Sequence, residues 1–475
     1  MSTLQDTFRW IAYLITGLAV LPLGAVDPMP LSFSILAICI FFLIAIATMK
    51  QEADRRQLLS YSFGALVITL LCIIAAAVMQ ANANAVFSLV GDSDLPELTT
   101  PSNTVMVIAT ELSRALPFLS VLLFFTGCIA IIQSRLSANR MIDFCANFGI
   151  VFAIFGLIQF LLFPDRLLIF EKKAYLDSLT SFLVNRNHAA TFIGVGILMQ
   201  MARITREWFW KRELLTIPML IYILCLLASV VALGQTLSRA GVFSTVVAAL
   251  FFLLGAGLIS TMKRKNRPYG GRTIWQTFVI PVAILGIVAV ILPLTFQPLV
   301  QRGFSSLATD GRLCTYETTV SAIARAWPSG YGIKQFEVLF PAFRNAECGI
   351  FGIWDFAHSV FLEALFSVGI FAIPIALGLF IPLIITFLRG IFSRRRYWFA
   401  SLIGLSIILL LTLHSLLDFS LQIHGVAIYS AMCLAALASA SLSSSSKTRE
   451  QTMPPDESSR EEDVDEPEPN VAQNT

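Results

Sequence analysis

Long apolar runs separated by short polar segments are the feature that most constrains this chain. A helix needs roughly 20 apolar residues to cross the bilayer core of about 30 Å, and about twelve runs approach or reach that length. Only 13% of the residues are charged, against about 25% in soluble domains, so one soluble core could not hide this much apolar surface. Continuous runs also differ from the alternating pattern of a barrel, and we predict an all-α polytopic membrane protein. The expected spans are about 9–26, 31–49, 58–80, 115–133, 141–163, 183–201, 214–233, 240–261, 274–296, 369–388, 398–418 and 421–442.

The distribution of lysine and arginine predicts how these spans are oriented. The first run lacks a small-residue cleavage site and is interpreted as a span rather than a signal peptide. With the N-terminus in the cytoplasm, 18 basic residues fall in short inner loops and 11 in much longer outer segments. Cytoplasmic loops carry such an excess, so we expect both termini inside. The membrane domain would cover residues 1–440, with outer segments at about 81–114 and 297–368. The second, a large structured loop, would lie between helices 9 and 10, and residues 441–475 would form a disordered acidic cytoplasmic tail.

Two of the eight cysteines lie together in the large outer loop. Cys314 and Cys348 could form a disulfide in an oxidising compartment, closing a loop of about 35 residues and contributing about 3–4 kcal/mol. Two free thiols are the alternative. The other six cysteines fall in expected spans, where small apolar residues are common.

Polar groups gather at the outer ends of the expected spans. All four histidines fall there, and so do Arg239, Arg312 and Asp418, whereas the middles of the spans are nearly free of charge. The histidines are His188, His358, His414 and His424. A chain of carboxylates across the membrane, as a proton-coupled pump would use, is not seen. The histidines lack metal-ligand spacing, and we expect no metal and no other cofactor. The working surface is predicted at the outer face.

Arginines with few carboxylates near them favour an anionic ligand such as a phosphate or diphosphate. Outside the cytoplasmic membrane, a common activated sugar donor is a glycan on a polyprenyl diphosphate. Arginines could stabilise the leaving diphosphate, and a histidine could take the proton of an acceptor hydroxyl. The predicted chemistry is therefore a glycosyl transfer.

Five segments resemble the O-antigen ligase and O-antigen polymerase family of bacterial envelope enzymes. They are NRNHAA (185–190), TLSRAG (236–241), the run from DGRLCTYETT to PAFR (310–344), HSVFLEALFSVG (358–369) and HSLLDFSLQI (414–423). The resemblance implies that His358 is the base and that Arg239 and Arg312 engage the diphosphate. A ligase pattern that begins at His358–Ser359 and includes Gly369 departs at Ala372, where the family has Gly, Thr or Tyr. The resemblance does not separate ligase from polymerase.

Other site residues carry open alternatives. Arg186 and His188 could contact the donor, or their segment could serve to cap span six through Asn185 or Asn187. Arg239 could instead reach lipid headgroups.

Five further side chains have structural or supporting roles as alternatives or expectations. Arg312 could pair with Asp310 or Glu317, and His358 could cap a helix. Glu363 is a candidate for a supporting role behind His358. His414 and Asp418, four residues apart, are expected to form a structural pair on one helix face.

We therefore expect a glycosyltransferase of the bacterial inner membrane, with its active face in the periplasm. The donor would be an undecaprenyl-diphosphate glycan, and the acceptor a hydroxyl of lipid A-core, of another glycan or of another molecule, for lipopolysaccharide or exopolysaccharide synthesis. Membrane lipid would surround it, and no nucleic-acid partner is expected. The alternatives are a solute transporter, for example of inorganic carbon, and a non-catalytic assembly partner. A transporter would need a polar path across the midplane, and Pro374 and Gly378 are the nearest approach to a broken helix.

Overall fold

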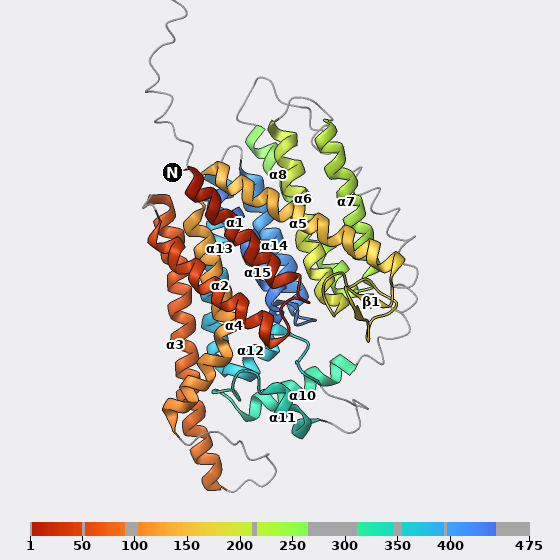
Figure 1. Ribbon diagram of the computed structural model, residues 1–475. Helices are drawn as coiled ribbons and strands as arrows, with labels where there is room; N and C mark the ends of the chain where they lie inside the picture. Colours follow the sequence, from red (N-terminus) through yellow and green to blue (C-terminus); the bar gives the residue numbers. More distant parts are fainter. Residues whose placement is uncertain are drawn as a thin grey trace, which may run out of the picture.

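The computed structural model describes residues 2–49, 53–90, 103–210, 216–264, 311–344, 354–393 and 397–442. Helices dominate these segments (Figure 1), and the one sheet described is a short antiparallel hairpin of β1 (Arg166–Leu167) and β2 (Phe170–Glu171). The first helices are α1 (Ser2–Val20), α2 (Pro28–Ala47), α3 (Ala53–Val90), α4 (Thr104–Ile131), α5 (Arg135–Leu162), α6 (Arg186–Trp210), α7 (Ile217–Gln235) and α8 (Arg239–Arg264). They are followed by α10 (Gly311–Arg325), α11 (Phe336–Phe343), α12 (Val360–Val368), η2 (Gly369–Phe371), α13 (Ala372–Ser393), α14 (Trp398–Ser415), η3 (Ser420–Gln422) and α15 (His424–Leu442).

The described helices confirm an all-α polytopic membrane protein. Among the described residues, nine helices are long and apolar enough to cross a membrane. The helices α1 and α6 coincide with expected spans but are not among the nine, and both carry charged residues, such as Asp6 and Arg9 in α1. The ninth expected span, 274–296, lies outside the described residues, as does most of the acidic tail, 443–475. The number twelve therefore stays a prediction.

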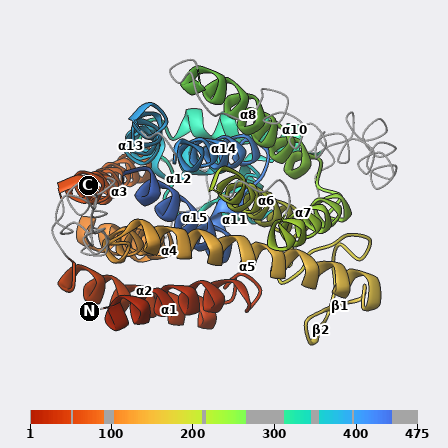
Figure 2. The same ribbon diagram turned by 90° about the horizontal axis from the view of Figure 1, so that it is seen from above.

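The centre of the bundle is formed by α15 and α14. Figure 2 shows α15 between the row of α4 and α5 and the pair of α6 and α14. In the apolar stretch of α15 that could cross a membrane, 94% of the residues are buried inside the protein. Small residues let helix backbones approach closely in membrane proteins, and α15 is rich in alanine and serine. The same device joins α5 to α6, because a Cβ added to Gly149 would lie 2.8 Å from the Cα of Gly196.

The described parts of the expected outer segment 81–114 are almost entirely helical. The helix α3 continues to Val90 and α4 begins at Thr104, while residues 91–102 are outside the described part. With 38 residues and a rise of 1.5 Å per residue, α3 is about 57 Å long, well beyond the bilayer core of about 30 Å. The apolar run predicts only the part of α3 that lipid can cover. The helix itself is longer, because backbone hydrogen bonding continues beyond the apolar residues.

The described part of the large expected loop is folded into a small lobe. Figure 1 shows α10, α11 and α12 at the end of the bundle opposite the start of α1. The lobe has its own apolar core, which is a property of a structured unit rather than of a linker. Its buried members are Ala322, Phe336, Leu339, Phe340, Ala357 and Phe366.

The lobe passes into the bundle through a break at Gly369. The helix α12 ends at Val368, Gly369 has φ +56°, and η2 leads into α13. The helical segment therefore starts before the expected span 369–388, and Gly369 is the break rather than Pro374 or Gly378. A positive φ costs glycine little, which explains why the chain bends at this position.

Candidate functional site

The first turn of α6 is organised by two asparagines with different tasks. Asn185 Oδ1 accepts a hydrogen bond from the backbone N–H of Asn187 at 2.8 Å, so Asn185 is the residue that caps α6. The side chain of Asn187 is used elsewhere. Its Nδ2 donates to Asp418 Oδ1 at 3.0 Å, and its Oδ1 accepts from Ser238 Oγ at 2.8 Å. Asn187 therefore joins the starts of α6 and α8 to the loop after α14.

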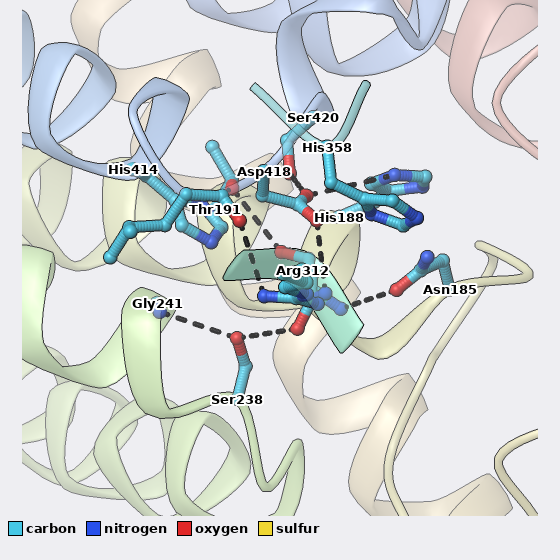
Figure 3. Close-up of polar contacts among 12 residues, drawn as sticks. Asn185, His188, Thr191, Ser238, Gly241, Arg312, His358, His414, Asp418 and Ser420 are labelled. Carbon is cyan, nitrogen blue, oxygen red and sulfur yellow. Dashed lines mark hydrogen bonds and ion pairs between the residues drawn. The ribbon is translucent and has the colours of Figure 1, made fainter. Parts of the chain in front are cut away.

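Asp418 is the centre of this buried network (Figure 3). Its carboxylate also accepts from Ser420 Oγ at 2.6 Å, and His188 Nε2 lies 3.8 Å from Oδ2. Burial acts to raise the pKa of the Asp418 carboxyl, but His188, His414, the Ser420 hydroxyl and Arg312 together bring this pKa below its ordinary value. The network therefore favours a carboxylate at this end of the bundle.

The expected pairing of His414 with Asp418 on one helix face is not the one found. The helix α14 ends at Ser415, so Asp418 lies beyond it and the helical i, i+4 relation does not apply. His414 Nδ1 instead hydrogen-bonds the hydroxyl of Thr191. In the part of the chain that the structure describes, the histidine within 4 Å of the Asp418 carboxylate is His188.

His358 and His188 come from distant parts of the chain but share one aromatic neighbour. The ring centroids of His188 and His358 lie 4.8 and 5.1 Å from that of Phe419, each edge-on. Figure 3 shows both imidazoles beside Asp418. Trp354 makes a similar edge contact with His358 at 5.0 Å. Two imidazoles thus stand together at the edge of the buried network.

The backbone around His358 is held from several directions. His358 has φ +56°, an uncommon conformation for a residue other than glycine. Its carbonyl oxygen accepts from the hydroxyl of Tyr316 at 3.0 Å. Ser359, rather than His358, is the residue that caps α12. Glu363 accepts from the backbone N–H of Ala357 at 2.7 Å. It therefore fixes the backbone just before His358.

The predicted arginines divide into one that joins the cluster and two that flank it. Arg312 Nη1 donates to the carbonyl of Leu417 at 3.2 Å, next to Asp418. Arg239 is the exposed first residue of α8, adjacent to Ser238. The guanidinium of Arg186 lies 5.3 Å from the ring centroid of Tyr175, in the segment before α6. Asp310, a suggested partner of Arg312, lies outside the described residues.

The other predicted groups lie apart from this cluster or stay untested. His424 Nε2 is 3.1 Å from Ser34 Oγ, between α15 and α2. Cys314 is disulfide-bonded, and Cys348 lies outside the described residues, so that pairing stays a prediction. Over the described ranges, no group of three or more His, Cys, Asp or Glu side chains is placed to hold a metal ion.

Sequence reasoning gave no role to several residues that build the site. Ser238, Thr191, Ser420 and Phe419 each contact one of the predicted polar residues. Ser238, Phe419 and Ser420 lie inside segments that carry the family resemblance, which was the available signal. Thr191 resembles an ordinary helix residue, and only its contact distinguishes it.

The fold and the cluster define a polytopic membrane protein with a histidine–arginine–aspartate site at one end of its bundle, beside a folded lobe. Residues 221–377 match the family described as O-antigen ligase. This segment runs from α7 into α13 and includes Arg239, Arg312 and His358. The match confirms the resemblance for this segment, which is less than half of the chain: residues 221–377 are similar to the O-antigen ligase family. A search of the curated proteins finds no match.

Proposed function

We propose that this chain transfers a glycan from a polyprenyl diphosphate carrier to an acceptor hydroxyl at the periplasmic face of the bacterial inner membrane. The observation that carries the proposal is the meeting of His358, His188, Asp418 and Arg312 at one end of the bundle, in a chain whose residues 221–377 match the O-antigen ligase family. Basic groups next to a titratable imidazole suit an anionic leaving group and a hydroxyl nucleophile.

In the proposed reaction His358 is the base. Its imidazole takes the proton of the acceptor hydroxyl while that oxygen attacks the anomeric carbon of the donor glycan. The bond from that carbon to the diphosphate oxygen breaks, and polyprenyl diphosphate leaves with the electron pair. A histidine suits this task because its ordinary pKa of about 6.5 lies near neutral pH.

Arginines would hold the diphosphate as negative charge develops on it. Arg312 lies at the cluster and Arg239 begins α8 beside it, and Arg186 and His188 are further candidates for donor contact. Guanidinium groups stay charged at every physiological pH and bind phosphate oxygens through two N–H groups at once. They would supply the charge stabilisation themselves, so we expect no cofactor.

Asp418 and Asn187 would support the site rather than contact the donor. Both are buried, and their hydrogen bonds connect the turn that carries Arg239 with the starts of α6 and η3. The acceptor would be lipid A-core for a ligase, or the end of another glycan repeat for a polymerase. The two reactions share the donor half of the site and differ in the surface that receives the acceptor.

The test is a pair of histidine substitutions in a strain that lacks the chromosomal copy. His358→Ala should abolish the envelope glycan that the wild-type chain restores, measured on gels, while the protein remains at normal level in the membrane. His424→Ala is the matched control, because His424 contacts Ser34 away from the cluster. A normal glycan pattern from well-expressed His358→Ala would refute the proposal. Analysis of the glycan product then separates ligase from polymerase, since a ligase defect leaves the lipid A-core without any repeat, whereas a polymerase defect stops only the joining of one repeat to the next.

A further inference from the structure

The helices α10 and α12 each carry a proposed functional residue near the N-terminal end. Arg312 lies in the first turn of α10, and His358 stands two residues before α12. These starts are in contact, since the Tyr316 hydroxyl donates to the His358 carbonyl at 3.0 Å. At 1.5 Å per residue, the far ends of α10 and α12 lie about 20 Å and about 13 Å away along the helices. The relative position of the two starts therefore depends on how the far ends are fixed.

The far ends are joined by backbone hydrogen bonds. The N–H groups of Tyr331 and Gly332, in the turn after α10, donate to the carbonyls of Phe366 and Ser367 at 2.8 Å each. The N–H of Ile370 returns a bond to the Pro328 carbonyl at 3.0 Å. The approach is close enough to exclude side chains. A Cβ on Gly330 would lie 2.7 Å from the Ser367 oxygen.

One side chain of α3 hydrogen-bonds to both sides of the junction at these far ends, that is, to the turn after α10 and to the last turn of α12. Gln80 Nε2 donates to the carbonyl oxygens of Ser329, at 3.0 Å, and of Ser367, at 2.9 Å. Gln80 is 6% exposed. Both N–H groups of one amide are thereby used, one on the turn after α10 and one on the last turn of α12.

A carboxyl group of α4 completes the junction. Glu111 Oε2 accepts from the backbone N–H of Ile333 at 2.6 Å, and Oε1 accepts from Arg114 Nη1 at 3.0 Å. Glu111 is 4% exposed. A Cβ on Gly332 would lie 2.9 Å from Glu111 Oε1, and Gly332 has φ +103°, so glycine is what allows this approach.

We infer that Gln80 and Glu111 are positioning residues, which set the spacing of Arg312 and His358 from the far ends of α10 and α12. The inference rests on the proposed function. The near ends of these helices are tied by Arg312 to Leu417 and by Ser359 to Ser415. A rigid helix needs a second fixed point to define its direction, and the bundle helices α3 and α4 supply that point. Small displacements of reacting groups lower the rate strongly even when the substrate still binds.

The decisive variant is Gln80→Glu, which keeps the shape of the side chain but replaces its N–H donors with oxygen. The donor would be polyprenyl-diphosphate glycan extracted from cells that lack the chain. It would be titrated against purified protein in the presence of lipid A-core as the added acceptor, with release of free polyprenyl diphosphate as the readout. We expect kcat to fall about 10- to 100-fold, while KM for the donor stays within about twofold. Hydrogen–deuterium exchange should rise in the peptides of α10 and α12.

The matched control is Gln200→Glu, the same substitution at a buried glutamine that donates to Ser229 between α6 and α7. It should leave exchange in the lobe unchanged. If Gln80→Glu does not accumulate in the membrane, two variants of Glu111 provide an independent comparison. Glu111→Gln keeps an oxygen for the Ile333 N–H and should retain most of kcat, whereas Glu111→Ala should lose it.

The outcomes distinguish a failure of the positioning role from a failure of the proposed function. Unchanged kcat in well-folded Gln80→Glu, or equal kcat in Glu111→Ala and Glu111→Gln, would overturn the positioning role while the wild-type chain remains active. A wild-type chain that releases no polyprenyl diphosphate would refute the proposed function itself. A fall in kcat with a parallel rise in KM would also count against positioning, because it would mean that donor binding had been lost.

Discussion

The different tasks of Asn185 and Asn187 lead to a quantitative prediction about stability. Asn185→Ala removes one helix cap, which costs about 1 kcal/mol. Asn187→Ala removes one hydrogen bond to the buried Asp418 carboxylate and one from the Ser238 hydroxyl. A hydrogen bond to a charged group contributes about 1.5–3 kcal/mol and one between neutral groups about 0.5–1.5 kcal/mol. Asn187→Ala should therefore lower the free energy of unfolding by about 2–4 kcal/mol.

The measurement is thermal unfolding of the purified variants in a single detergent. The fall in Tm for Asn187→Ala should be about two to four times the fall for Asn185→Ala. A double-mutant cycle tests the cause. Ser238→Ala should cost less in the Asn187→Ala background than in the wild type, by about 0.5–1.5 kcal/mol. Equal falls in Tm for the two asparagine variants, or strict additivity in the cycle, would refute this account of the network.

Three further predictions concern the lobe and the flanking arginine. Gly369→Ala should reduce the protein level and increase proteolysis within the lobe, because the new Cβ would meet the Pro328 carbonyl and φ is +56°; a variant as resistant as the wild type would contradict this. Arg239→Ala, at an exposed position, should raise KM for the donor with little change in Tm, and an unchanged KM would remove Arg239 from the donor site. Non-reducing peptide mapping should recover Cys314 joined to Cys348, and both thiols found free would exclude the disulfide.

Local patterns were sufficient for the membrane class and for most of the helices. Backbone polar groups in lipid must be hydrogen-bonded within the protein, and a helix satisfies all of them within one segment. Runs of about 20 apolar residues therefore predict spanning helices directly. The same reasoning brought His188, His358, Arg312 and Asp418 to one end of the bundle, because span ends alternate between two faces. It could not show where a helix continues beyond its apolar part, and α3 was predicted too short for that reason.

Contacts between distant segments were decided only by the tertiary structure. Asp418 is separated from Asn187 by 231 positions, and nothing in the spacing of His414 and Asp418 shows that α14 ends between them. Gln80 and Glu111 stand in ordinary helical sequence, and their partners are backbone groups of a turn more than 200 residues away. Apolar periodicity is a property of each segment, so the sequence by itself determined the class of protein and the end of the bundle at which its polar groups meet. Which of those groups touch depends on how packed helices place short hydrogen-bonding side chains, and a shift of about 1 Å decides whether such a bond exists.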